Sequence, residues 1–580
     1  TIKNVSAHND LLILSIIIDD HEQRSVHHFS NKKLPFEQYL IISTPPTPNG
    51  DLHLGHLSGP YLKADVLRRF LFLNGVAAYH LTGQDNHQSY TASKAKTLGW
   101  DAESTAKHFG NEIYQTLTSA DIKTDFFCRP ESTIGYTESI QKYVLKLWEQ
   151  GMITIKEASS VICKNCDRYL YEVYVQGVCP HCSTPTRGNF CEACGKINDC
   201  ADLIEPKCSD CNTPATTIKL RRAYFNLSHF SSHLAEYLQQ VPMSKGLREY
   251  CHEILLHPLP DVPVSHAAQW GIPCPIPSLE DQIISVWFEM GLGHLTMAQA
   301  FVSESNPEFL KTGLEFWQNE NATLIYTFGF DNSFFNCFLF PATFMGLKQG
   351  LKPASSLYFN QFYCLKDMKF STSRNHLVWA KDFLAQHSSD SLRYYLAMTS
   401  PEEQMTNFSM DHFSQVIPLF KEAIEDCLKR LDFEIQENCQ GTIPYTGLWT
   451  DQHLSFYNAV LDAYEKMTEH YHPDTFSIQA AQRALHELLI LIREALCSEF
   501  KFSRAYTYTD EYRTSVALAV FALKVLSLVS YPILPRTSLQ LWEGLGMSQP
   551  MSWQKLPKLN WRERTPSSLL ACIDSSAFTV

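Results

Sequence analysis

Apolar residues follow two different spacings along the chain, and the change between them marks out the predicted elements. Residues 39–43 form a short β-branched run that ends in a Pro- and Gly-rich turn, and apolar positions then recur at helical spacing over 57–74. A second apolar run, 78–81, leads into another polar turn. Strand, turn and helix in this order are the unit of a doubly wound α/β domain, whose ligands bind beyond the carboxyl ends of the strands. We therefore predict a Rossmann-type parallel sheet.

The same unit returns after an interruption. Residues 285–293 and 323–344 are each predicted as an apolar strand that runs into a turn and a helix. From residue 411 onward the apolar spacing is almost wholly helical, which predicts an α-helical bundle. The predicted parts are an N-terminal extension (1–34), a first Rossmann half (35–115), a cysteine-rich insertion (116–245), a second Rossmann half (246–360), a loop region (361–410) and the bundle (411–580).

Composition and charge narrow the function classes. The chain has 580 residues, 44% of them apolar and 19% charged, which is typical of a globular protein of two to four domains. Its formal net charge of −13 repels a polyanion, so any nucleic-acid contact must be local. The apolar run at 11–18 is short and is followed by two aspartates, which predicts a strand and neither a membrane span nor a signal peptide.

Half of the 18 cysteines fall between residues 163 and 211, and eight of these nine form C-x-x-C pairs. Two such pairs supply the four thiolates of a tetrahedral zinc site, so we predict two structural zinc ions. Free buried cysteines are the alternative, but polar and turn-forming residues inside the pairs argue against it. Thiolate ligands need a reducing compartment, so we expect a cytoplasmic protein. The predicted ligands are Cys163, Cys166, Cys179, Cys182, Cys191, Cys194, Cys208 and Cys211, and Cys200 lies outside the pairing.

Two histidines, His53 and His56, stand three residues apart at the start of the helix predicted over 57–74, beside glycines. The positive end of a helix favours phosphate, so this pair is a candidate triphosphate site. Taken alone, two histidines at this spacing are more often solvated surface residues.

The surrounding motifs decide between these alternatives. The segment that contains the two histidines, PTPNGDLHLGH, resembles the HIGH signature of class I aminoacyl-tRNA synthetases, and later segments resemble the methionyl-tRNA synthetase family in order. The resemblance implies that residues 361–410 hold a KMSKS-like loop and a stem-contact region. The further matching segments are HLTGQDNHQ (80–88), the four cysteine pairs, WGIPCPIP (270–277), VWFEMGLGH (286–294), FGFDNSFF (328–335), KFSTSRN (369–375) and DSLRYYLAM (390–398).

The resemblance implies ATP- and Mg²⁺-dependent activation of an amino acid as an adenylate, a reaction that needs positioning and charge stabilisation. Asp85 is expected to hold the substrate's ammonium group and Trp287 to line its side-chain pocket, although a turn cap and a core aromatic are the alternatives. The implied catalytic residues are His53, His56, Lys369, Ser371 and Ser373. The implied ATP-binding residues are Pro46, Asn49, Gly55, Gly329 and Asp331. The implied amino-acid-binding residues are Thr47, Asp85, Trp287, His294 and Asn336.

Several positions depart from the family pattern. Thr47 and His294 stand where the family has pocket tyrosines, and Asn336 where it has a histidine, which argues against methionine as the substrate. Thr372 replaces the second lysine of KMSKS, so one group expected to stabilise charge on the phosphates is missing. A pocket rebuilt from other residues is the alternative.

The predicted bundle departs most. Asp426 and Arg430 match an Asn and Arg pair that reads the anticodon in the family, no Pro-Trp pair occurs over 500–513, and residues 411–580 hold 15 Lys and Arg against 20 Asp and Glu. These features argue against tRNA binding. The alternative is a bundle that only braces the catalytic half.

Three hypotheses follow. The first is a biosynthetic ligase that passes the activated amino acid to a small-molecule amine or hydroxylamine, like the synthetase part of hydrazine-forming enzymes, with a cupin-like metal domain as a further partner. The second is a divergent methionine–tRNA ligase. The third, a non-catalytic relative, is disfavoured by the intact motif residues. None of the three involves a membrane.

Overall fold

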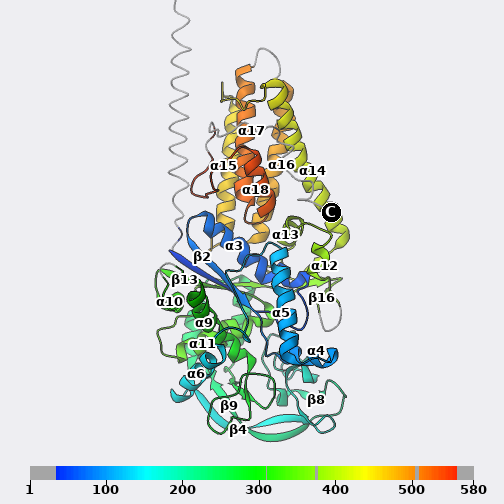
Figure 1. The fold of residues 1–580 in the computed structure, drawn as a ribbon, viewed down its shortest axis with the longest axis vertical. Helices are drawn as coiled ribbons and strands as arrows, with labels where there is room; N and C mark the ends of the chain where they lie inside the picture. The colour runs from blue at the N-terminus through cyan, green and yellow to red at the C-terminus, as the bar shows by residue number, and fades with distance from the viewer. Residues whose placement is uncertain are drawn as a thin grey trace, which may run out of the picture.

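The chain folds into an α/β body that carries an upright helical bundle at one end and a cysteine-rich insertion at the other (Figure 1). The computed structural model describes residues 34, 36–307, 310–371, 376–502, 509–557 and 559. The predicted extension over 1–34, with its strand at 11–18, and the candidate residue Ser373 therefore lie almost wholly or wholly outside the described residues.

A five-stranded sheet forms the middle of the body, in the order β14-β13-β1-β2-β3, and every neighbouring pair in it is parallel. This confirms the predicted doubly wound sheet. The chain builds β2 and β3 on one side of β1 and later β13 and β14 on the other, so the order reverses at β1 and β13. The strands are β1 (Gln38–Ser43), β2 (Ala77–Gly83), β3 (Phe126–Cys128), β13 (Ala322–Gly329) and β14 (Ser356–Asn360). Because β3 belongs to this sheet, the chain segment that forms the first half of the sheet continues past residue 115, to Cys128.

Helices on both sides of the sheet bury its apolar strands. The helix predicted over 57–74 begins at α2 (Leu54–His56), passes through a wider turn (Leu57–Tyr61) that contains Pro60, and continues as α3 (Leu62–Leu73). At Gly59 in this turn, a side chain would come within 2.7 Å of the Asn360 amide at the end of β14. The other helices of the body are α4 (Ser89–Leu98), α5 (Ala102–Ser119), α6 (Tyr136–Glu149), α7 (Ser231–Gln240), α8 (Lys245–Leu255), α9 (Val286–Ser305), α10 (Glu315–Gln318), α11 (Phe340–Gly346), α12 (Ala380–Leu384) and α13 (Ser389–Met398).

The strand predicted over 285–293 is wrong. Only β12 (Ile283–Ile284) is extended there, and it pairs with β11 (Ser265–His266), whereas Val286 begins the 20-residue helix α9. Residues on all faces of α9 are buried, so its apolar run lacks the one-sided spacing of a surface helix and resembles a buried strand.

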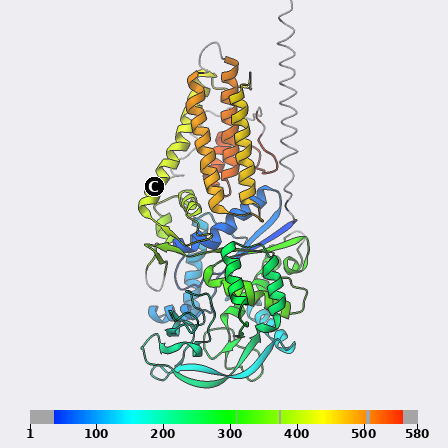
Figure 2. The ribbon, with the colours of Figure 1, turned by 180° about the vertical axis from the view of Figure 1, so that it is seen from behind.

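The insertion forms small antiparallel sheets at the end of the body opposite the bundle, as Figure 2 shows from behind. One sheet has the order β10-β9-β4-β5 and the other β7-β6-β8. A further small sheet, β16-β15-β17, leads from the body toward the bundle. The strands are β4 (Ile153–Cys163), β5 (Arg168–Tyr169), β6 (Val175–Val178), β7 (Pro185–Arg187), β8 (Ile204–Cys208), β9 (Thr216–Asn226), β10 (Asp261–Pro263), β15 (Tyr363–Leu365), β16 (Met368–Lys369) and β17 (Thr406–Phe408).

The bundle is helical as predicted. It contains α14 (Met410–Phe433), α15 (Asp451–Tyr471), α16 (Ile478–Phe502), α17 (Thr509–Ser530) and α18 (Pro535–Gly544). Among the described residues, α17 is the one helix long and apolar enough to cross a membrane, and 94% of its apolar window is buried inside the protein, as in a core helix. The buried Arg393 of α13 ties the bundle to the body: it pairs with Asp65 of α3 at 2.7 Å and donates to the Pro532 and Ile533 carbonyls after α17.

Candidate active site

The two histidines of the HIGH-like segment form one unit at the start of α2. The backbone N–H of His53 donates to Nδ1 of His56 at 3.1 Å, and that of His56 donates to Nδ1 of His53 at 3.2 Å. Their rings stack with centroids 3.7 Å apart. Because both Nδ1 atoms accept a hydrogen bond, the proton of each neutral imidazole lies on Nε2. Each ring therefore keeps one N–H donor for a ligand.

The two imidazoles are neutral near pH 7. Burial lowers the pKa of His56 to about 4; the ammonium group of Lys369 adds to this effect and Asp331 opposes it. Burial, with His56 and Lys369 nearby, also holds the pKa of His53 well below its usual value. Gly55 lies between the pair and Phe370, where a Cβ would approach the His53 ring to 3.0 Å. The glycine thus permits the close packing of this turn.

Lys369, at the end of β16, is surrounded by acidic and aromatic groups. Its Nζ lies 2.8 Å from Oε1 of Glu192, 3.6 Å from Oδ2 of Asp331 and 4.0 Å from the centre of the Phe362 ring. Burial disfavours the ammonium group, but the two carboxylates outweigh burial and raise the pKa of Lys369. Asp331 follows β13, with Gly329 packed against its carboxylate. A cation and two neutral N–H donors therefore gather at the carboxyl edge of β1 and β13.

The segment after the KMSKS-like residues returns to the histidines. Ser371 and His376 exchange backbone hydrogen bonds, and the backbone N–H of Leu54 donates to the Val378 carbonyl at 3.1 Å. Residues 372–375, which include Thr372 and Ser373, lie outside the described residues.

Asp85, after β2, is buried beside the turn that follows β1. Its backbone N–H donates to the Pro46 carbonyl at 2.9 Å, and its carboxylate accepts from Gln88 at 2.8 Å. In the same turn the half-buried Thr47 accepts from the N–H of Asn49 through its carbonyl. Burial and the carboxylate of Glu289 raise the pKa of Asp85 well above its usual value, although the Gln88 hydrogen bond opposes this. A buried carboxylate with this environment favours a cationic partner.

The aromatic residues predicted to line the amino-acid site lie on α9 and after β13. Trp287 stacks face to face on Phe335, with centroids 3.6 Å apart. His294, two turns after Trp287 on α9, packs against Tyr326 and Phe340. Both His294 ring nitrogens and the Trp287 Nε1 are buried without a hydrogen-bond partner among the described residues. Burial lowers the pKa of His294 to about 3, so its imidazole is neutral. The side chain of Asn336 is buried and donates to the Asn332 carbonyl.

Sequence reasoning missed two acidic residues of the site. Glu289, on α9, is 1% exposed and accepts from Nδ1 of His87 at 2.7 Å, beside Asp85. Glu192 lies between two predicted zinc ligands and contacts Lys369 from 177 positions away in sequence. The first carried a signal, because a carboxylate inside the apolar run 286–293 needs a partner. Glu192 carried no such signal, since only the fold brings the insertion to the candidate catalytic residue Lys369.

The eight paired cysteines form two clusters, and within each cluster the sulfurs lie within 4.8 Å of one another. All cysteines in the described residues are free of disulfides. Four thiolates converging at this spacing fit a tetrahedral Zn²⁺. The outer cluster is Cys163, Cys166, Cys208 and Cys211, and the inner cluster is Cys179, Cys182, Cys191 and Cys194.

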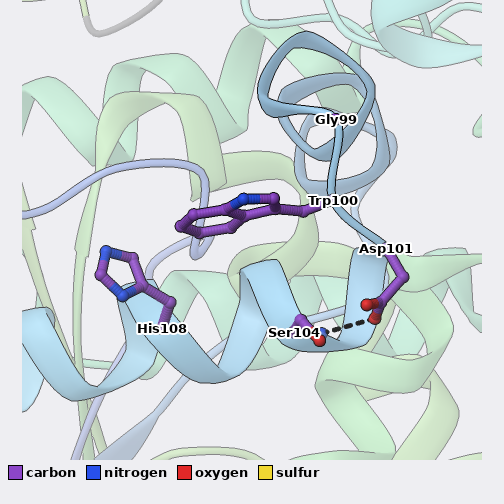
Figure 3. A pocket seen from close by; sticks show the side chains of 5 residues that line it. All are labelled: Gly99, Trp100, Asp101, Ser104 and His108. Atoms are coloured by element: carbon purple, nitrogen blue, oxygen red, sulfur yellow. Dashed lines mark hydrogen bonds between the residues drawn. The ribbon is translucent and has the colours of Figure 1, made fainter.

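A surface hollow lies where α4 is followed by α5, and none of its lining residues belongs to the predicted site (Figure 3). Trp100 and His108 face each other there, and Asp101 caps α5 by accepting from the Ser104 N–H at 2.8 Å. Asp101 thus has a structural role as the cap of α5.

In the bundle, the structure gives Asp426 a local partner. Its Oδ2 lies 2.6 Å from a guanidinium nitrogen of Arg493 on α16, whereas Arg430 is exposed at the last turn of α14. Asp426 is thus engaged in an ion pair within the bundle, so its identity alone does not argue against an RNA ligand.

Comparisons with known proteins give relatives that span most of the chain. A methionine–tRNA ligase of Thermomicrobium roseum is 28% identical over 516 residues, covering 86% of this chain and 85% of the relative. One of Bacillus mycoides is 30% identical over 408 residues, covering 69% of this chain and 73% of the relative. The fold is similar to that of Mycobacterium tuberculosis methionyl-tRNA synthetase in complex with methionyl-adenylate, with a TM-score of 0.72, 18% identity, and coverage of 88% and 94% of the two chains.

These relatives correct one prediction. The prediction of an amine or hydroxylamine acceptor in place of a doubtful tRNA, with a possible cupin-like partner domain, is wrong, because proteins similar over most of this chain are methionine–tRNA ligases. The error arose because residues that differ from the family pattern, such as Asp426, were interpreted without the residues that contact them in the fold.

The family described as tRNA synthetases class I (M) matches residues 39–419, which include the sheet, both cysteine clusters and the start of α14. The match agrees with the two neutral histidines, the adjoining lysine and the converging cysteines. The chain belongs to this class I tRNA synthetase family and is an adenylate-forming ligase.

Proposed function

We propose that the chain is a methionine–tRNA ligase, which activates methionine with ATP and transfers the methionyl group to tRNA. The observation that carries the proposal is the neutral His53–His56 pair beside Lys369, at the carboxyl edge of β1 and β13. It supplies two N–H donors and one ammonium group, which suit a triphosphate.

The chemistry follows from these groups. The carboxylate of the amino acid attacks the α-phosphorus of ATP, the bond to pyrophosphate breaks, and an aminoacyl adenylate remains. His53 and His56 donate from Nε2 to the phosphates, and Lys369 neutralises charge that develops on the departing pyrophosphate. The low pKa values of His53 and His56 keep both imidazoles neutral, so each ring donates its Nε2–H to a phosphate oxygen without taking up a further proton. Mg²⁺ would accompany ATP as part of the substrate and would screen the charge on its phosphates.

The amino acid is held on the other side of the turn that follows β1. Asp85 pairs with the ammonium group of the substrate. Burial and Glu289 raise the pKa of Asp85, and the positive charge of the bound substrate opposes this shift and favours the ionised carboxylate. The Trp287–Phe335 stack offers a flat apolar surface to a thioether. Because His294 stays uncharged, it places no buried charge next to the apolar side chain of the substrate.

The tRNA acceptor is supported by the relatives that cover the bundle as well as the catalytic body. A ribose hydroxyl at the end of the tRNA attacks the carbonyl carbon of the adenylate, an ester forms, and AMP leaves. Two structural zinc ions, one in each cysteine cluster, would hold the insertion in place, and their thiolates favour the reducing cytoplasm.

Pyrophosphate exchange measured with each of the twenty amino acids, followed by charging of tRNA, tests the proposal. We expect methionine to drive the fastest exchange and to be transferred to tRNA carrying a methionine anticodon. Faster exchange with another amino acid would contradict the substrate, and exchange without tRNA charging would contradict the acceptor.

A further inference from the structure

The inner cysteine cluster lies directly against the candidate phosphate site. Tyr250 donates its hydroxyl to the Gly195 carbonyl at 2.6 Å, and Phe190 packs against Phe335, the ring that stacks on Trp287. Gly195 has a φ of +70°, and a Cβ there would meet the Tyr250 ring at 2.5 Å and Phe330 at 3.1 Å. The cluster is thus fitted to the two segments that frame the ATP and amino-acid sites.

From this cluster Glu192, between Cys191 and Cys194, reaches the catalytic lysine. Its carboxylate lies 2.8 Å from Nζ of Lys369, closer than the 3.6 Å of Asp331. The Lys369 side chain is 26% exposed and that of Glu192 is 55% exposed. The lysine is therefore mostly enclosed by the protein, whereas the carboxylate has room to turn toward solvent. An ammonium group with two carboxylates nearby has its charge already balanced.

We propose that Glu192 is a positioning residue that competes with the phosphates for Lys369. A triphosphate carries more charge than one carboxylate and takes the ammonium group from Glu192. After the reaction Glu192 again competes for Lys369 while pyrophosphate is still bound, which weakens the hold on this product. The contact therefore costs some ATP affinity and speeds pyrophosphate release.

The competition makes a paired quantitative prediction. In Glu192→Gln the KM for ATP and the inhibition constant for pyrophosphate should both fall, by a similar factor of roughly two to five, because a partly exposed ion pair is weak. The KM for the amino acid should stay unchanged, since Glu192 pairs with Lys369 on the phosphate side of the site. A merely structural residue would raise these constants or lower kcat.

The double variant identifies the route. In a Lys369→Gln background, Glu192→Gln should change neither constant, because the group for which it competes is absent. Glu157→Gln, an exposed glutamate on β4 of the same insertion, is the matched control and should behave as the unmodified protein. Direct ATP binding, measured by equilibrium dialysis without amino acid, gives a readout that does not depend on turnover.

Three results would overturn the proposed competition between Glu192 and the phosphates. An unchanged or raised KM for ATP in Glu192→Gln, or an effect that persists without Lys369, overturns the proposal. Zinc per chain is measured for Glu192→Gln and Glu192→Ala, and loss of metal in both would show a structural role and overturn it too. The inference rests on the proposed role of Lys369; if Lys369→Gln alone leaves ATP and pyrophosphate affinity unchanged, that role fails first and can be told apart.

Discussion

The phosphate side and the amino-acid side of the candidate site satisfy their polar groups differently. On the phosphate side, His53 and His56 bond to each other's backbone and Lys369 lies between two carboxylates. On the amino-acid side, the Trp287 Nε1 and both His294 nitrogens are buried without a partner in the described structure. A buried polar atom without a partner costs free energy, so such atoms persist where a ligand or bound water completes them. The first side is preorganised, and the second depends on what binds.

The largest expected effect tests the preorganised side. His56→Ala removes both an Nε2–H donor and the Nδ1 acceptor that fixes His53, so kcat for pyrophosphate exchange should fall by about a hundredfold to a thousandfold. His56→Gln, which keeps an amide donor, should recover part of the rate. His108→Ala, at an exposed histidine, serves as control. A loss below tenfold in His56→Ala would mean that the pair does not bind the phosphates.

A smaller effect is expected at the ammonium anchor. Asp85→Asn should raise the KM for the amino acid by roughly ten- to a hundredfold, as for the loss of a charge-assisted hydrogen bond of about 1.5–3 kcal/mol. In the unmodified protein this KM should fall as pH rises, because the raised pKa of Asp85 leaves part of the carboxyl protonated at lower pH. Asp382→Asn on α12, an exposed aspartate, is the control. A pH dependence that survives in Asp85→Asn would assign the titration to another group.

His294 tests the side with unpartnered atoms. His294→Phe replaces two buried nitrogens by carbon, so the free energy of unfolding should rise by about 1–3 kcal/mol in urea denaturation. The KM for methionine should change only severalfold if no ligand group bonds to the imidazole. Loss of stability would show instead that an ordered water or neighbouring group satisfies the ring.

A further expected effect, seen only in acid, is a pH dependence of stability. The pKa of His56 is about 4 in the folded chain and near 6.5 in the unfolded chain, so only the unfolded chain takes up this proton in between. This contribution to stability is complete above about pH 6.5 and is lost as the pH falls to about 4. His56→Gln should flatten this part of the urea midpoint profile, and an unaltered slope would contradict the assignment.

The fold was largely predictable because its signals are local. The strands β1, β2 and β13 follow short apolar runs, and the bundle follows a sustained helical spacing. The helix α9 was not predictable in this way, because burial on every side erases its periodicity. In the candidate site, the cysteine pairs and the histidine pair were visible in sequence, whereas the contacts of Glu192, Glu289 and Asp426 were not.

By itself the sequence determined the strands of the doubly wound sheet, the cysteine pairs and the synthetase-like motifs, since each is visible within a short stretch of the chain. Tertiary structure decided which charges meet. Arg493 neutralises Asp426 from another helix, and Glu192 reaches Lys369 from the insertion, so the local charge at each residue differs from what its own segment indicates. Electrostatic interactions fall with distance in space, and the chain's order does not give that distance.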